Sequence, residues 1–119
     1  MFGGIVVKGE GKSKNFGFPT ANLDFYDSKS EFDDGIYAVI CFLDGQRYAG
    51  ALYIDSDSMK LEVHILNYSG DDFYGKFLEV DVISKVSDVK KGLDNQSLVK
   101  KIDSDVRKVK EVLVELDDF

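Results

Sequence analysis

Thr20 and Asn22 are oxygen-bearing side chains whose spacing suits a metal site. In an extended chain, residues two apart point to the same side and lie about 7 Å apart. Mg²⁺ prefers oxygen ligands and commonly takes one or two of them from the protein, while substrate phosphates and water complete its shell. The pair therefore indicates a site for Mg²⁺. The alternative is a Thr and an Asn that only hydrogen-bond to the local backbone.

The segment just before this pair is rich in glycine and lysine. Gly9 and Gly11 allow the backbone to approach a ligand closely, and Lys12 and Lys14 supply positive charge to an acidic chain. Free backbone N–H groups in such a loop can bind phosphate oxygens. We expect these four residues to bind phosphate groups, and the alternative is a surface turn without a ligand.

Glu62 is a candidate site residue on a predicted strand. It lies in the run Leu61–Leu66, where alternation with a period of two places apolar side chains on one face of the strand and Glu62 and His64 on the other. Glu62 would then project toward a covering loop or cleft. The alternatives are a solubilising strand Glu and a structural or surface His64, to which we assign no catalysis.

Strands are needed to position these residues. The segments richest in β-branched and aromatic residues are about Gly4–Lys8, Gly35–Leu43, Arg47–Ile54, Lys60–Asn67 and Phe77–Ser84, with a sixth extended piece near Thr20–Phe25. Asp44–Gly45 between two of them is a hairpin signal, because Gly readily adopts a positive φ. Six antiparallel strands joined by short turns can close into a barrel, which removes exposed edges.

The last part of the chain predicts one amphipathic helix, from about Asn95 to Leu116. Its apolar residues recur at spacings of three and four: Val99, Ile102, Val106, Val109, Leu113 and Leu116. Asp94 is the expected N-cap, because its carboxylate can accept a hydrogen bond from an unpaired backbone N–H. We expect the helix to close one side of the barrel, and the alternatives are binding to a partner or to a membrane surface.

Composition limits the number of domains and the kinds of ligand and environment that we expect. A chain of 119 residues with 44% hydrophobic residues supports one core, so we expect a single domain over residues 1–119. A net charge of −7 has the wrong sign for binding nucleic-acid phosphates. Cys41, the single cysteine, falls in an apolar run and is expected to be a buried thiol. No apolar stretch approaches the ~20 residues that span a bilayer, and we expect a cytoplasmic monomer.

The motifs together resemble the riboflavin kinase family. The pattern Gly-x-Gly-Lys-x-Lys that begins at Gly9, followed by the run Gly17–Asn22, looks like the signature of that family. Gly35–Tyr37, the Glu-x-His strand Leu61–Leu66 and Asp72–Gly75 agree with its framework in order and spacing. The resemblance covers nearly the whole chain.

This resemblance implies a fold, a reaction and a set of roles. The fold would be a mainly β, six-stranded antiparallel Greek-key barrel with one C-terminal helix, and the reaction would convert riboflavin and ATP to FMN and ADP. Gly9 and Lys14 would contact nucleotide phosphates, Thr20 and Asn22 would serve Mg²⁺ and nucleotide, and Glu62 would be the catalytic base. Phosphoryl transfer asks the protein mainly to position reactants and stabilise charge.

The resemblance also indicates a loop that closes on the flavin. The family commonly has an Arg and, five residues later, a Phe in this loop, and the matching positions here are Ser87 and Gly92, with Lys90 between them. We therefore name Ser87, Lys90 and Gly92 as candidate flavin-binding residues. The alternative function is a binding module of the same barrel fold that holds a flavin or a nucleotide without turnover.

Overall fold

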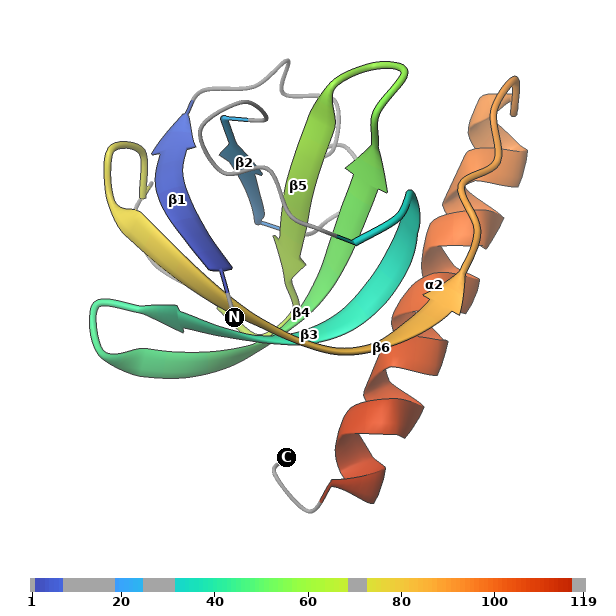
Figure 1. The fold of residues 1–119 in the computed structure, drawn as a ribbon. Helices are drawn as coiled ribbons and strands as arrows, with labels where there is room; N and C mark the ends of the chain where they lie inside the picture. The colour runs from blue at the N-terminus through green and yellow to red at the C-terminus, as the bar shows by residue number, and fades with distance from the viewer. Residues whose placement is uncertain (1, 8–18, 25–31, 69–72, 117–119) are drawn as a thin grey trace.

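A closed antiparallel barrel flanked by one helix is the architecture of the chain (Figure 1). The computed structural model describes residues 2–7, 19–24, 32–68 and 73–116. Its elements are the strands β1 (Phe2–Val7), β2 (Thr20–Leu23), β3 (Gly35–Leu43), β4 (Gln46–Asp55), β5 (Lys60–Ile65) and β6 (Phe77–Ser87) and the helix α2 (Asn95–Glu115).

The order of strands around the barrel is β1-β2-β5-β4-β3-β6. Strands β3, β4 and β5 follow one another as antiparallel neighbours, and β6 returns by a longer connection to lie beside β3. That arrangement is the Greek key. The mainly β, six-stranded Greek-key barrel with a C-terminal helix is therefore confirmed.

The ends of β5 and β6 differ from the prediction in ways that bear on the site. β5 ends at Ile65 rather than Asn67, because Asn67 Oδ1 accepts a hydrogen bond from the backbone N–H of Ala49 at 3.1 Å and the chain turns there. β6 continues to Ser87, beyond the predicted Ser84, and its last residues still pair with β3 across two register shifts. The extension matters because it brings Ser87 alongside α2.

The turn between β3 and β4 has the predicted conformation. Asp44 and Gly45 both have positive φ, at 51° and 77°. Two consecutive positive φ values define the turn that matches the right-handed twist of a two-stranded hairpin.

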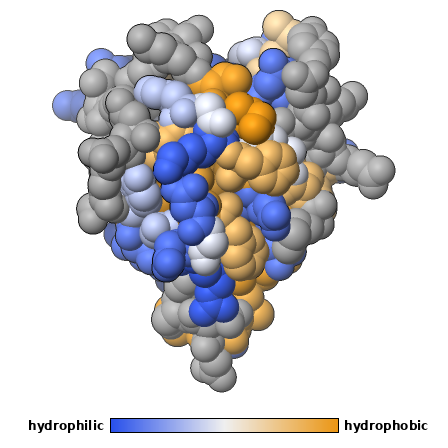
Figure 2. All heavy atoms as spheres, turned by 90° about the vertical axis from the view of Figure 1, so that its left-hand side faces the viewer, coloured by the Kyte–Doolittle hydropathy of each residue, from blue (hydrophilic) through white to orange (hydrophobic). Residues whose placement is uncertain are grey.

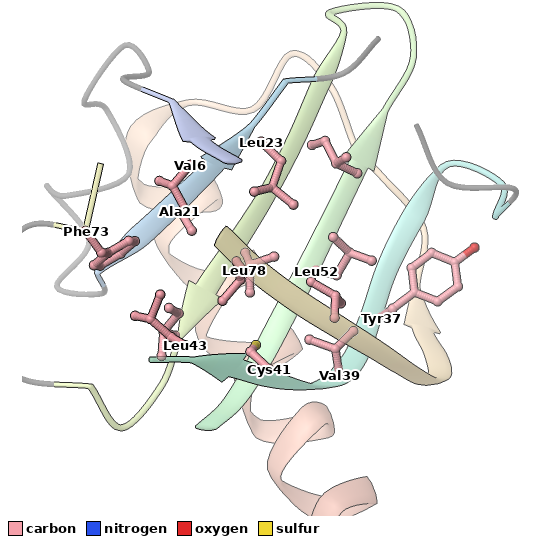
Figure 3. Close-up of a cluster of buried hydrophobic side chains, with 14 of the residues drawn as sticks. Val6, Ala21, Leu23, Tyr37, Val39, Cys41, Leu43, Leu52, Phe73 and Leu78 are labelled. Atoms are coloured by element: carbon pink, nitrogen blue, oxygen red, sulfur yellow. The ribbon is translucent and has the colours of Figure 1, made fainter. Parts of the chain in front are cut away.

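The interior of the barrel is filled by apolar side chains from all six strands and Phe73 (Figure 3). Alternate residues of β5 show the expected pattern, because Leu61, Val63 and Ile65 are buried inside. Cys41 is also buried there, as predicted, and burial raises the pKa of its thiol to about 12. The thiol is therefore protonated at neutral pH and serves as core packing.

Helix α2 packs on the outside of the barrel, where small side chains leave room for it. Ala38, Ala49 and Ala51 on β3 and β4 lie in one buried cluster with Val109 and Leu113 of the helix. Figure 1 shows α2 running alongside the barrel next to the end of β6. The helix thus covers the outer face of the sheet and leaves the barrel interior to the strands.

The buried face of α2 differs from the predicted one at both ends and at Asp105. Val99 and Leu116 are 41% and 42% exposed, whereas Asp105 is buried among the apolar positions. The reason is that Leu98 and Ile102 turn toward the barrel, and Val99 is rotated about 100° from Leu98 around the helix axis. The Asp94 N-cap is confirmed, since its Oδ1 accepts a hydrogen bond from the Ser97 N–H at 2.8 Å.

Apolar residues also occur on the outside of β1 and the start of β6. Ile5 and Phe77 are Cα partners, and with Val7 they are among the exposed large hydrophobic residues. On the face that looks left in Figure 1, apolar surface is interrupted by a band of hydrophilic residues (Figure 2). Within the described ranges, no helix is long and apolar enough to cross a membrane.

Gly50→Ala should destabilise the barrel, because a Cβ at this position of β4 would lie 2.6 Å from Cys41 Sγ and 3.0 Å from Val39 Cγ2. Overpacking of this kind typically costs about 1–3 kcal/mol, which urea denaturation can measure. In a Cys41→Ala background the same substitution should cost less. An equal cost in both backgrounds would show that the contact with sulfur is not the cause.

Candidate functional site

Four polar side chains come together on the outer face of β2 and β5. The two strands are antiparallel neighbours, and their register pairs Thr20 with His64 and Asn22 with Glu62. Directly opposed residues of antiparallel strands have Cβ atoms about 4.5–5.5 Å apart. The candidate metal ligands and the candidate base, which are 40 residues apart in the chain, are therefore close neighbours in space.

Glu62 and His64 are sheltered from solvent. Glu62 Oε2 lies 3.8 Å from His64 Nε2, and the two side chains are 13% and 12% exposed. Such shielding is not typical of a solubilising strand Glu. The carboxylate is held at a partly buried position beside an imidazole and opposite Asn22.

Thr20 and Asn22 offer one hydroxyl and one amide oxygen on the same side of β2. Thr20 is 6% exposed and Asn22 is partly buried, while Ala21 between them faces the core. Among the residues that the structure describes, no group of three His, Cys, Asp or Glu side chains could hold a metal ion. The donor set at β2 fits Mg²⁺, which commonly takes few protein oxygens and completes its shell with phosphates and water.

A pocket adjoins this group of residues, between the barrel and α2. Its volume is about 50 Å³, and it is lined by Ile36, Ala51, Tyr53, His64, Lys90, Leu98, Lys101, Ile102, Asp105 and Val106. His64 belongs both to the pocket and to the pair with Glu62. Tyr53 also links the two, because it is the Cα partner of Glu62 on β4. The pocket therefore lies next to the candidate base.

Ser87 is hydrogen-bonded to the helix. Its hydroxyl donates to Asp105 Oδ1 at 2.6 Å, and Lys101 Nζ donates to Ser87 Oγ at 2.9 Å and to Asp105 Oδ2 at 2.6 Å. A buried carboxylate such as Asp105 needs such compensation. The network joins the end of β6 to α2 and fixes the wall of the pocket formed by Lys101 and Asp105.

The other two candidate flavin-binding residues follow β6. Lys90 lines the pocket. Gly92 is exposed at φ 73°, a left-handed conformation that favours glycine, and it does not line the pocket. Of the three candidates, only Lys90 lines the pocket, whereas Ser87 is hydrogen-bonded to two lining residues, Lys101 and Asp105.

Lys91 joins this segment to the turn between β4 and β5. Its Nζ lies 3.0 Å from Asp55 Oδ1 and 2.8 Å from Asp57 Oδ2. Burial raises the pKa of Asp55, but hydrogen bonds from Ser58 and Lys91 outweigh it, so that the pKa is lowered from its usual value. The hydrogen bonds to Asp57 and Asp55 raise the pKa of Lys91. Asp55 and Lys91 are therefore both charged at neutral pH and form an ion pair.

Part of the predicted site lies outside the described residues. Gly9, Gly11, Lys12 and Lys14 belong to residues 8–18, which connect β1 to β2. The nucleotide-binding role of these four residues stays a prediction.

Sequence reasoning missed three features of the site. The Lys101–Asp105 pair has i, i+4 spacing on a helix and could have been found from that spacing. The contact of Lys91 with Asp55 and Asp57, and the position of Tyr53 on the pocket, had no local signal. They depend on how β4 packs against segments far along the chain.

Comparison with known proteins agrees with the barrel fold. The family model Flavokinase, described as riboflavin kinase, matches residues 1–113. The chain therefore belongs to the riboflavin kinase family, and this confirms the resemblance found from the motifs.

Two curated relatives are distant in sequence. The chain is 26% identical over 113 residues to the RNA-binding riboflavin kinase RibR of Bacillus subtilis (strain 168), which covers 89% of this chain and 48% of the relative. It is 27% identical over 106 residues to a bifunctional riboflavin kinase/FMN adenylyltransferase of Mycoplasma pneumoniae, with 87% and 39% covered. The chain thus spans about half the length of these relatives or less.

Solved structures share the fold. The riboflavin kinase from Trypanosoma brucei superposes with a TM-score of 0.70 at 23% identity, covering 94% of this chain and 75% of that one. A protein from Streptococcus pneumoniae named as a macrolide-efflux protein superposes with a TM-score of 0.78 at 26% identity, covering 92% and 38%. These likenesses agree with the barrel and its C-terminal helix.

Asp55→Asn should lower stability at neutral pH by about 1–3 kcal/mol, because Asp55 is buried and accepts charge-assisted hydrogen bonds. The folded-state pKa of Asp55 lies below the unfolded one, so its stabilisation is present above about pH 4 and is lost as the pH falls through the folded value. The difference between wild type and Asp55→Asn should therefore shrink in acid.

Urea denaturation at pH 7 and at pH 3 measures this difference. Asp57→Asn is the matched control, because Asp57 contacts the same lysine but is 83% exposed, and exposed changes usually stay within about 0.5 kcal/mol. Two results would contradict the stabilising role of the ionised Asp55: equal effects of the two substitutions, or a stability difference between wild type and Asp55→Asn that grows in acid.

Proposed function

We propose that this chain is a riboflavin kinase that transfers the γ-phosphate of ATP, with Mg²⁺, to the 5′-hydroxyl of riboflavin and releases FMN and ADP. The observation that carries the proposal is the pairing of Asn22 with Glu62 across β2 and β5. In this proposal, Asn22 would be an oxygen donor for a metal–nucleotide complex and would lie opposite Glu62, which would accept a proton. Membership of the riboflavin kinase family supports flavin phosphorylation as the reaction class.

In this proposal the nucleotide and metal lie on the β2 side of the site. Thr20 and Asn22 would hold Mg²⁺, which would neutralise charge on the transferred phosphoryl group. Gly9, Gly11, Lys12 and Lys14 would bind the phosphates. The position of Thr20 and Asn22 on one side of β2 supports this arrangement.

The flavin would lie on the α2 side, in the pocket that reaches His64. This location would direct the ribityl chain toward Glu62, which would accept the proton of the 5′-hydroxyl as it attacks the γ-phosphorus. The pocket of about 50 Å³ is too small for a three-ring heterocycle, since one water needs roughly 10–15 Å³ measured in the same way. Binding must therefore displace side chains at the pocket, and the exposed Lys90 is the one best placed to move.

The second candidate function is a barrel that binds flavin or nucleotide without turnover. One observation favours it: Ser87 is hydrogen-bonded to Lys101 and Asp105, and neither Ser87 nor Gly92 lines the pocket, so two of the three candidate flavin-binding residues are not on the pocket surface.

We propose that the chain is a monomer with a single domain, that its substrates are small molecules, and that it does not bind nucleic acid. The net charge of −7 argues against extending RNA binding from the relative to this chain.

Incubation with riboflavin, ATP and Mg²⁺, followed by chromatography for FMN, tests the proposed activity directly. FMN formation that depends on both ATP and Mg²⁺ supports the kinase. Riboflavin binding without FMN across several nucleoside triphosphates and divalent metals would support the binding module.

Glu62→Gln should lower kcat by at least about a hundredfold, because general-base assistance contributes roughly 10²–10⁴-fold. The amide keeps the size of the side chain but cannot accept the proton, so the KM values and the melting temperature should change little. The matched control is Glu79→Gln, an exposed glutamate on β6. A folded Glu62→Gln variant with wild-type kcat would remove Glu62 as the base.

Asn22→Ala should weaken Mg²⁺-dependent nucleotide binding by about tenfold or more, because loss of a metal-site group commonly costs 10–100-fold in affinity. Titration of the nucleotide with and without Mg²⁺ separates the metal-dependent part. Asn95→Ala, at the exposed start of α2, is the control. If the Mg²⁺ effect on affinity is unchanged in folded Asn22→Ala, this residue is not a ligand.

A further inference from the structure

The pocket between the barrel and α2 has an apolar wall with few polar groups. Ile36 and Ala51 on the strands face Leu98, Ile102 and Val106 on the helix. Among the described residues that line the pocket, Tyr53 has the only phenyl or phenol ring. A flat heterocycle entering this pocket has one aromatic hydrocarbon surface to lie against.

The position of Tyr53 on β4 places it between the pocket and Glu62. Tyr53 is the Cα partner of Glu62, and the neighbouring outward residue Ala51 is the partner of His64. Directly opposed Cβ atoms are about 5 Å apart. The base of the tyrosine side chain is therefore beside the proposed proton acceptor, and Tyr53 also lines the pocket.

Tyr53 is partly buried, so that the surrounding groups influence its phenol. Burial raises its pKa, and the nearby carboxylates of Asp55 and Glu62 raise it further. The phenol is therefore neutral at physiological pH. A neutral ring can lie against a flat heterocycle without the cost of burying a charge, and aromatic pairs contribute about 0.5–1.5 kcal/mol beyond the area they bury.

We propose that Tyr53 forms the aromatic wall against which the isoalloxazine ring of riboflavin lies, and that this contact sets the preference of the site for a flat heterocyclic substrate. The inference rests on the proposed function, since it assigns a residue to the flavin half of that site. A structural alternative is that Tyr53 only fills space between β4 and α2.

The test compares Tyr53→Phe, which keeps the ring, with Tyr53→Leu, which keeps an apolar side chain without a ring. Tyr53→Leu should raise the KM for riboflavin about tenfold, since this factor corresponds to the loss of one good aromatic contact. Its kcat and its KM for ATP should change by less than about threefold, because a uniformly bound contact affects KM alone. Tyr53→Phe should keep the KM for riboflavin within about threefold.

The control is Tyr48→Leu, on the same strand but packed against Tyr68 at 5.5 Å and absent from the pocket wall. It should lower the melting temperature without raising the KM for riboflavin. If Tyr53→Leu does not fold, Tyr53→Met is the second variant without a ring. Equilibrium titration of riboflavin fluorescence, without ATP, gives a Kd that does not depend on turnover.

The outcomes separate this inference from the proposed function. FMN formation by wild type with an unchanged riboflavin KM and Kd in folded Tyr53→Leu would overturn the role of Tyr53 and leave the kinase. Riboflavin binding that weakens in Tyr53→Leu but not in Tyr53→Phe, with no FMN formed by wild type, would support Tyr53 and overturn the kinase. Equal weakening in both variants would overturn the aromatic contact.

Discussion

The register between β2 and β5 is the constraint on which the candidate site depends. Backbone pairing of Asn22 with Glu62 and of Thr20 with His64 aligns two segments that are 40 residues apart in the chain. A slip of β2 by one residue would turn Ala21 outward and Thr20 and Asn22 toward the core, because successive side chains of a strand point to opposite faces. The packed interior of the barrel opposes such a slip, so the core that stabilises the fold also orients the polar residues.

Helix α2 adds a second half to the site without entering the barrel. Alanines on β3 and β4 let it approach the sheet closely at Val109 and Leu113. Nearer its N-terminus the pocket lies between the helix and the strands. The hydrogen bonds among Ser87, Lys101 and Asp105 hold this end of the helix to the end of β6. Removing one partner of this network would leave a buried polar or charged group without compensation.

The chain shares the riboflavin kinase fold and differs from the expected sequence pattern at the residues proposed for the flavin half of the site. Where the family resemblance suggests an arginine and then an aromatic residue, this chain has Ser87 at the end of β6, hydrogen-bonded to the helix, and Gly92, which is exposed. The aromatic ring on the pocket comes from β4, at Tyr53, and the cations come from Lys90 and Lys101. The pocket therefore has an aromatic side chain from β4 and cations from both the segment after β6 and α2.

The sequence by itself determined the barrel, the helix and the polar motifs. Period-two alternation in Leu61–Ile65 predicted which side of β5 faces the core, and Asp94 was identified as the cap because capping is a local interaction. Tertiary structure alone decided that Asn22 lies opposite Glu62, that Ser87 is bonded to Asp105, and that Tyr53 lines the pocket. Local signals extend over a few residues, whereas these contacts join residues 18 to 40 or more positions apart and depend on the packing of the whole barrel.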